Sequence, residues 1–175
     1  MRNTLLIFLF LLMYGIGLSQ NFHDINITSI TGEELSMSTF KGQYVMVVNV
    51  ASRCGYTKQY ADLEKLYQNY DNLVIIGVPC NQFANQEPKN ENEILQFCSS
   101  KYNVTFPMTS KVNVKGKNKH ALYQWLTEKE YNKTGDYKIS WNFNKFLVDP
   151  NGKLVGHFKS KIKPLSKEIT SILNK

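Results

Sequence analysis

The chain has 175 residues, of which 42% are hydrophobic and 20% are charged, and its formal net charge is +7 at pH 7. This length suits one domain with a substantial core, and the balanced composition excludes fibrous and disordered classes. The positive charge comes almost entirely from scattered lysines, because the arginines are Arg2 and Arg53 alone. Nucleic-acid-binding proteins usually interleave arginine and aromatic residues along a basic stripe, so we expect no nucleic-acid partner.

The first residues have the layout of a secretory signal peptide. A short basic start leads into an apolar run over residues 5–13, and the small residues Gly17 and Ser19 precede a cleavage site expected before Gln20. The apolar run is too short to span a membrane comfortably. We therefore expect residues 1–19 to be a signal peptide and the protein to be exported, either to a periplasm or as a secreted protein. An uncleaved membrane anchor is the alternative.

The first half of the remaining chain predicts a βαβ unit. Continuous apolar runs at 44–50 and 73–78 are typical of strands covered on both faces. Between them, tyrosine and leucine residues recur at helical spacing over about 60–70. The two strands should be parallel, because a helix connects them. Upstream, residues 25–36 predict a short strand pair.

The second half predicts further helices and a hairpin. Helices are expected at 91–102 and at about 120–128, followed by a β-hairpin over 143–158 and an amphipathic helix over 165–173. This order of elements predicts an α/β protein with a thioredoxin-like fold. We expect a central mixed sheet flanked by helices, with one inserted helix, in a single domain over residues 20–175.

The position of Cys54 favours a reactive thiol over a structural one. Cys54 directly follows the first strand of the βαβ unit, at the edge of the sheet where ligands and reactive groups collect. A helix N-terminus there would stabilise a thiolate, which is the nucleophilic form of cysteine. Thr57 stands where a CxxC disulfide oxidoreductase would have its second cysteine. The histidines are isolated, so we expect no metal and no cofactor.

Near the same edge of the sheet, two other stretches carry hydrogen-bond donors that do not ionise. Residues 78–88, VPCNQFANQEP, leave the second strand, and residues 140–149, SWNFNKFLVD, enter the hairpin. They carry the amides of Gln86 and Asn142 and the indole N–H of Trp141. Each of these residues taken alone is also common in turns or at the edge of a core.

Together these stretches resemble the glutathione peroxidase family. The matching blocks are NVASRCGYT at 49–57, PCNQF and QEP within 79–88, and WNF and KFLVD within 141–149. The resemblance covers nearly all of residues 23–173, with Val78 where phenylalanine is usual and Lys89 where glycine is common. It identifies residues 20–175 as a single thioredoxin-like glutathione peroxidase domain.

The resemblance implies a thiol peroxidase that reduces hydrogen peroxide and organic or lipid hydroperoxides. Cys54 matches the peroxidatic cysteine, and Gln86, Trp141 and Asn142 match the rest of the catalytic tetrad. Cys98 resembles the resolving cysteine of the non-selenium, two-cysteine branch, which is usually reduced by thioredoxin-type proteins rather than by glutathione. The expected cycle passes from a Cys54 sulfenic acid to an internal disulfide, for which the helix that carries Cys98 must open locally.

Several features remain open in the sequence. Cys80 lies in a block that family members carry whatever their reductant, and we expect it to pack near the end of the second strand. The short polar segment 127–139 implies a monomer with an open site, which would admit lipid hydroperoxides at a membrane surface. The alternative functions are an exported thiol-disulfide oxidoreductase and a peroxide-sensing redox relay.

Overall fold

A computed structural model describes residues 21–174. The signal peptide expected at residues 1–19 lies outside these described residues. Within the described part, none of the helices has the length and apolar character that a membrane crossing requires.

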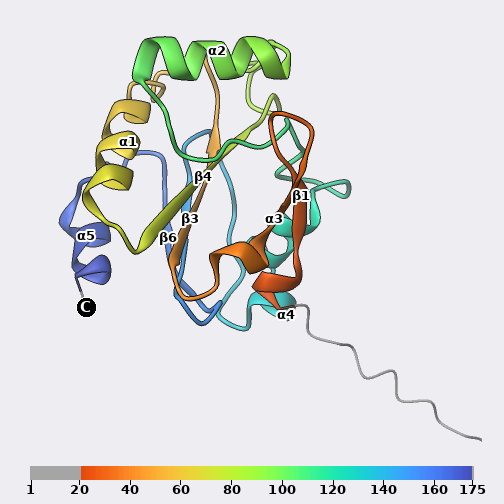
Figure 1. Ribbon diagram of the computed structural model, residues 1–175. Coiled ribbons are helices and arrows are strands. Elements are labelled where there is room, and N and C mark those ends of the chain that lie inside the picture. Colours follow the sequence, from red (N-terminus) through yellow and green to blue (C-terminus); the bar gives the residue numbers. More distant parts are fainter. Residues whose placement is uncertain (1–20, 175) are drawn as a thin grey trace, which may run out of the picture.

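A four-stranded mixed sheet in the order β4-β3-β5-β6 forms the centre of the molecule (Figure 1). β3 and β4 are parallel, whereas β5 is antiparallel to both β3 and β6. A separate antiparallel pair, β1 and β2, lies at the start of the chain. These pairings confirm the expected βαβ unit, hairpin and leading strand pair. The bounds are Asn26–Thr28 for β1, Glu34–Ser36 for β2, Tyr44–Val50 for β3, Leu73–Pro79 for β4, Lys145–Val148 for β5 and Leu154–Phe158 for β6.

The helices cover both faces of the sheet and one of its ends. In Figure 1, α1 and α5 lie on one side of the sheet, α3 and α4 lie on the other, and α2 crosses the top. The single turn α4 was not expected from the sequence. The arrangement is the expected thioredoxin-like one. The bounds are Gln59–Asn69 for α1, Glu91–Tyr102 for α2, Ala121–Thr127 for α3, Lys129–Asn132 for α4 and Lys167–Leu173 for α5, with short 3-10 helices at Phe22–Asp24 and Met37–Phe40.

Alternate side chains of the sheet build two separate core layers. Met46 and Val48 of β3 pack with α1, α2 and α5, in what we call the α1 layer. Val45 and Val47 point the other way and pack with α3 and the β1–β2 pair, in the α3 layer. Each such aliphatic side chain, once fully buried, contributes about 1.5–3 kcal/mol to the free energy of unfolding. The two layers matter for the site because they assign each cysteine to one side of the sheet.

Local signals fix both ends of α2. The side chain of Asn90 accepts a hydrogen bond from the Glu93 N–H, and the Glu93 carboxylate accepts one from the Asn90 N–H, which makes a reciprocal capping box. At the other end, Asn103 adopts a left-handed conformation with φ of 52° and donates its N–H to the last carbonyls. Ile94 and Cys98 face the core between these caps. The helix therefore begins and ends where the sequence predicts.

Gly77 tests the tightness of the packing beside β4. The segment that contains Met108 bonds to both sides of the Gly77 backbone, and a Cβ added at Gly77 would overlap the Met108 sulfur. We predict that Gly77→Ala lowers the free energy of unfolding by about 1–3 kcal/mol, because overpacking forces neighbouring side chains to move. Urea unfolding measures this change. Gly55→Ala is the control, since a Cβ there meets nothing within 4 Å; equal losses in both variants would contradict the packing argument.

Candidate active site

Cys54 lies in the turn between β3 and α1, with its side chain 8% exposed. The Tyr56 N–H points at the Cys54 sulfur from 3.4 Å. The Cys54 N–H donates to Thr57 Oγ1 at 2.9 Å, and the Thr57 hydroxyl donates in turn to the Ala51 carbonyl at 2.8 Å. Because α1 begins only at Gln59, the N–H group directed at the sulfur comes from the turn rather than from the first helical turn. Thr57, noted in the sequence only as a missing cysteine, closes this turn.

The structure joins Gln86 and Asn142, which lie 56 residues apart in the sequence. The Asn142 Nδ2 donates to Gln86 Oε1 at 3.1 Å, and the Gln86 carbonyl accepts the Arg53 N–H at 3.0 Å. Asn142 is completely buried, and its Oδ1 has no hydrogen-bond partner among the described residues. Three distant segments therefore meet beside Cys54, and they bring with them amide groups with unused hydrogen-bonding capacity.

Trp141 forms part of the open rim of this region. Its side chain is 37% exposed, and its ring packs against Phe83 with the centroids 5.9 Å apart. The indole therefore combines a fixed apolar contact with access to solvent. A shallow pocket of about 360 Å³ adjoins the Cys54 turn through Tyr56, and its lining comprises Tyr56, Ser140, Trp141, Lys159, Ser160 and Lys161.

The turn that carries Trp141 and Asn142 is strained and clamped. Phe143 has φ of 64°, which is rare for a bulky residue, costs about 1–3 kcal/mol and persists only where the surroundings impose it. Asn49 imposes it: its carbonyl accepts the Phe143 N–H at 2.5 Å, and its Nδ2 donates to the Trp141 carbonyl at 3.1 Å. The buried amine of Lys145 donates to the Phe143 carbonyl at 2.8 Å. Sequence reasoning gave Asn49 no separate role, although one polar residue inside the buried strand 44–50 was a usable signal.

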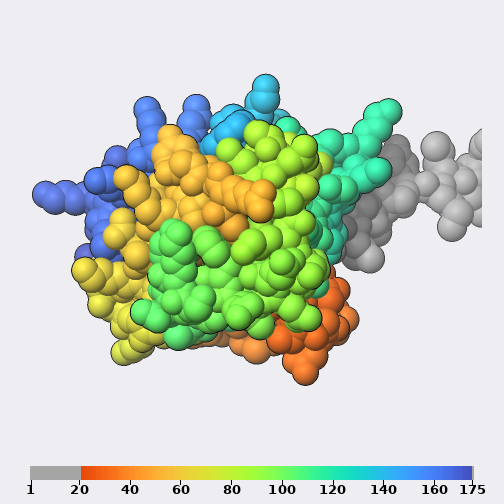
Figure 2. Space-filling view, turned by 90° about the horizontal axis from the view of Figure 1, so that it is seen from above, coloured from red at the N-terminus to blue at the C-terminus, as the bar shows by residue number. Residues whose placement is uncertain are grey.

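The three cysteines are free thiols that fall into different core layers. Cys54 and Cys98 belong to the α1 layer, whereas Cys80 packs in the α3 layer on the other side of the sheet. Cys98 is 1% exposed, and burial raises the pKa of its thiol to about 11. Figure 2, a view onto the α2 end of the molecule, shows the amber segment after β3 next to the green atoms of α2. Cys98 is therefore the second thiol on the same side of the sheet as Cys54.

Tyr60 connects α2 to the turn of Asn142. Its ring lies 5.4 Å from the Tyr102 ring at the end of α2 and 5.4 Å from the ring of Phe143, measured between centroids. The side chain is fully buried, and burial is the main cause that raises the pKa of its hydroxyl. The nearby Cys98 thiol contributes to that shift, but the hydroxyl makes no aligned hydrogen bond with any described residue.

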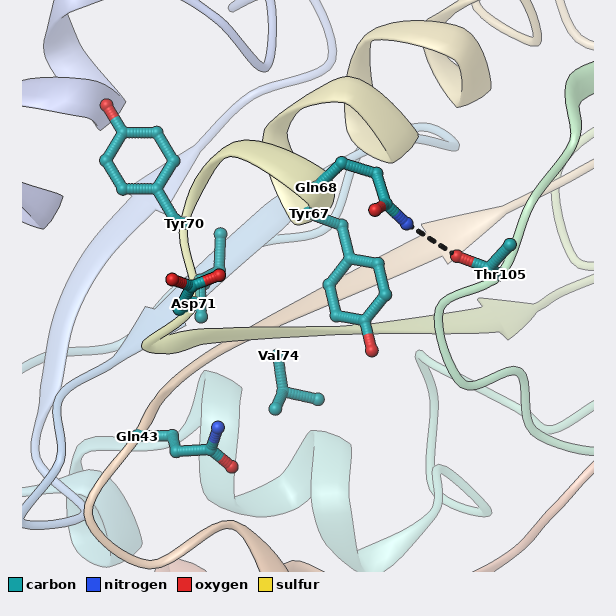
Figure 3. A pocket seen from close by; sticks show the side chains of 8 residues that line it. Gln43, Tyr67, Gln68, Tyr70, Asp71, Val74 and Thr105 are labelled. Carbon is teal, nitrogen blue, oxygen red and sulfur yellow. Dashed lines mark hydrogen bonds between the residues drawn. The ribbon is translucent and has the colours of Figure 1, made fainter.

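A second pocket, shown in Figure 3, lies away from these residues. It has a volume of about 440 Å³ and includes Leu73, the first residue of β4, so it lies at the opposite end of the parallel strands from Cys54. In it, Gln68 Nε2 donates to Thr105 Oγ1 at 2.9 Å. The pocket contains none of the expected site residues. Within residues 21–174, no three His, Cys, Asp or Glu side chains form a group suited to a metal ion.

Comparisons with known proteins show a family match. The family model for glutathione peroxidase matches residues 22–127. The chain is 44% identical over 155 residues to the glutathione peroxidase homolog BsaA of Bacillus subtilis, covering 86% of this chain and 97% of that protein. It is also 44% identical over 162 residues to glutathione peroxidase-like peroxiredoxin 2 of Saccharomyces cerevisiae, covering 90% and 100%.

Solved structures show the same fold. The crystal structure of Trgpx in its apo form has a TM-score of 0.69 at 35% identity, covering 90% of this chain and 97% of that one. A secreted disulfide oxidoreductase of Mycobacterium tuberculosis has a TM-score of 0.59 at 12% identity, covering 87% and 95%. At that identity the second likeness concerns the fold alone.

Lys145 generates a prediction about pH. Burial lowers the pKa of its amine from 10.5 to about 7. Between these pH values the unfolded chain binds the extra proton, so the free energy of unfolding rises as the pH rises from 7 towards 10.5. We predict that Lys145→Met removes this rise, which for one group is at most about 1.4 kcal/mol per pH unit. Urea unfolding at fixed ionic strength measures it, with the exposed Lys153→Met as control. Parallel pH curves for wild type and Lys145→Met would contradict the prediction.

Proposed function

The chain belongs to the glutathione peroxidase family and is a thiol peroxidase, and we propose that Cys54 is the residue that reduces the peroxide. One observation carries the proposal: the hydrogen bond between Asn142 and Gln86, with the Gln86 carbonyl on the Arg53 N–H, gathers three segments around the Cys54 turn. The substrates we propose are hydrogen peroxide and organic or lipid hydroperoxides.

In the first step, the Cys54 thiolate attacks one oxygen of the peroxide. A sulfur–oxygen bond forms as the O–O bond breaks, and the second oxygen leaves with the electron pair and takes up a proton as water or an alcohol. Cys54 becomes a sulfenic acid. The Tyr56 N–H lies 3.4 Å from the sulfur and donates a hydrogen bond to it. We assign Gln86, Trp141 and Asn142 as the donors that stabilise the departing oxygen.

In the second step, Cys98 resolves the sulfenic acid. Its sulfur attacks the Cys54 sulfur, a disulfide forms, and the sulfenic oxygen leaves as water with the proton from Cys98. The location of Cys98 in the α1 layer supports this pairing, since its thiol faces the same side of the sheet as Cys54. We propose that α2 opens locally before the two sulfurs meet, since a disulfide needs the two Cα atoms within about 7 Å. We propose a thioredoxin-like protein as the reductant of this disulfide, glutathione as the alternative, and a monomer as the working form.

The first test removes the attacking sulfur. We predict that Cys54→Ser abolishes peroxide consumption and keeps a native circular dichroism spectrum, because a serine hydroxyl is a far weaker nucleophile at neutral pH. Stopped-flow measurement with thioredoxin or glutathione as donor records the loss, and the donor that sustains wild-type turnover identifies the reductant. Full activity in Cys54→Ser would overturn the proposed function.

The second test separates the two steps. We predict that Cys98→Ser consumes about one equivalent of peroxide per Cys54 and then stalls with thioredoxin, because its sulfenic acid has no internal partner and over-oxidises in excess peroxide. Mass spectrometry detects the stalled species. Cys80→Ser is the matched control and should keep the thioredoxin-driven cycle, because Cys80 faces the α3 layer. A Cys54–Cys80 bond in peroxide-treated wild type would refute the assignment of Cys98.

A further inference from the structure

Glu87 is a buried carboxylate to which the proposed chemistry gives no role. Its side chain is 0% exposed. Its Oε2 accepts hydrogen bonds from the N–H and the hydroxyl of Ser52, both at 2.8 Å, while its Oε1 has no partner among the described residues. Burial raises the pKa of this carboxyl, and the two bonds from Ser52 and then the charges of Lys111 and Lys89 oppose that rise.

The nearby lysines Lys111 and Lys89 stabilise the Glu87 carboxylate by their charge but make no salt bridge with it. Lys111 Nζ donates to the backbone carbonyls of Glu87 and Lys89 rather than to the Glu87 carboxylate. Removing a carboxylate from water costs several kcal/mol unless hydrogen bonds or a counter-charge compensate. Within residues 21–174, every hydrogen bond that the carboxylate oxygens of Glu87 accept comes from Ser52. The hydrogen bonds that compensate the burial therefore come from Ser52, two positions before Cys54, and the charges of Lys111 and Lys89 add to them.

Glu87 and Gln86 together bind the two residues that precede Cys54 in the chain. The N–H of Ser52 goes to the Glu87 side chain, and the next N–H, that of Arg53, goes to the Gln86 carbonyl at 3.0 Å. The side chain of Gln86 meanwhile reaches Asn142. Because Gln86 and Glu87 are adjacent, the carboxylate fixes the Cys54 turn against the same short segment that carries the Gln86 amide.

The Glu87 segment is itself firmly anchored. The Glu87 N–H donates to Asn81 Oδ1 at 2.9 Å, and the Glu87 carbonyl accepts from Lys111 Nζ at 3.1 Å. The carboxylate therefore transmits a fixed backbone position to Ser52 and does not simply follow the Cys54 turn.

We propose that Glu87 is a positioning residue of the peroxidase, which sets the distance between the Cys54 sulfur and the amides of Gln86 and Asn142 by holding Ser52. This inference rests on the proposed function of Cys54. Glu87 acts through Ser52. A misplacement of about 1 Å between reacting groups costs on the order of 10²-fold in rate.

The test compares two substitutions in a Cys80→Ser, Cys98→Ser background, where Cys54 is the remaining thiol. Glu87→Leu removes the acceptor and Glu87→Gln keeps it. The readouts are the second-order rate of Cys54 with hydrogen peroxide and its alkylation rate with iodoacetamide, which does not need donors for a departing peroxide oxygen. We expect Glu87→Leu to lower the peroxide rate by about 10²-fold. Glu87→Gln should lose less than about tenfold, because neutral hydrogen bonds are roughly half as strong as charge-assisted ones. Alkylation should change far less than the peroxide rate in both variants.

Urea unfolding of each variant supplies the control for folding. If Glu87→Leu does not fold, Ser52→Ala takes its place, because it deletes the hydroxyl donor and leaves the Ser52 N–H bond intact; it should then lower the peroxide rate more than the alkylation rate. A folded Glu87→Leu with the peroxide rate of its background would overturn the inference. So would a Glu87→Gln as slow as Glu87→Leu, or equal losses in both reactions. A background protein whose Cys54 does not react with peroxide would instead overturn the proposed function, and this inference with it.

Discussion

The side chain of Asn49 holds together two parts of the chain on which the candidate site depends. It donates to the Trp141 carbonyl and accepts the Asn144 N–H, while its backbone carbonyl accepts the Phe143 N–H. These bonds keep Phe143 in its left-handed conformation and so aim Asn142 at Gln86. Each bond adds only about 0.5–1.5 kcal/mol net, but a buried group left without its partner costs about 1–3 kcal/mol. Asn49 therefore stabilises the turn mainly because a different turn conformation would leave buried polar groups without hydrogen bonds.

The sequence predicted those parts of the structure that local signals control. The bounds of α2 follow from Asn90, Glu93 and Asn103, which lie within or next to the helix. The continuous apolar runs of β3 and β4 likewise are local signals, and they predict buried parallel strands. The clamp of Asn49 on a turn over ninety residues away could not be predicted, because it arises only once the sheet pairs. The same holds for Glu87, whose partner Ser52 lies 35 residues before it. The resemblance to the glutathione peroxidase family identified the tetrad residues, whereas the contacts among them are visible only in the folded structure.

Around Cys98, a well-capped helix lies next to a buried hydroxyl group that is poorly hydrogen-bonded. Caps at both ends make α2 a regular helix, and burial keeps the Cys98 thiol protonated at neutral pH. Against this, Tyr60 holds a buried hydroxyl without an aligned partner directly below α2. Its neighbour is the Cys98 thiol, a weak hydrogen-bond partner, so the hydroxyl gains stronger hydrogen bonds when water reaches it. Opening α2 is thus less expensive than the regularity of the helix alone would indicate.

The two core layers also act as a partition between thiols. Cysteines whose Cβ atoms point apart cannot be bridged without moving the backbone. The Cys80 side chain packs in the α3 layer, whereas the Cys54 side chain packs in the α1 layer on the other side of the sheet. A Cys54–Cys80 disulfide would have to join side chains from opposite faces of the sheet, whereas the Cys54–Cys98 disulfide that we propose joins side chains of one core layer. Under that proposal, the choice of partner for Cys54 depends on the face of the sheet to which the chain topology assigns each cysteine.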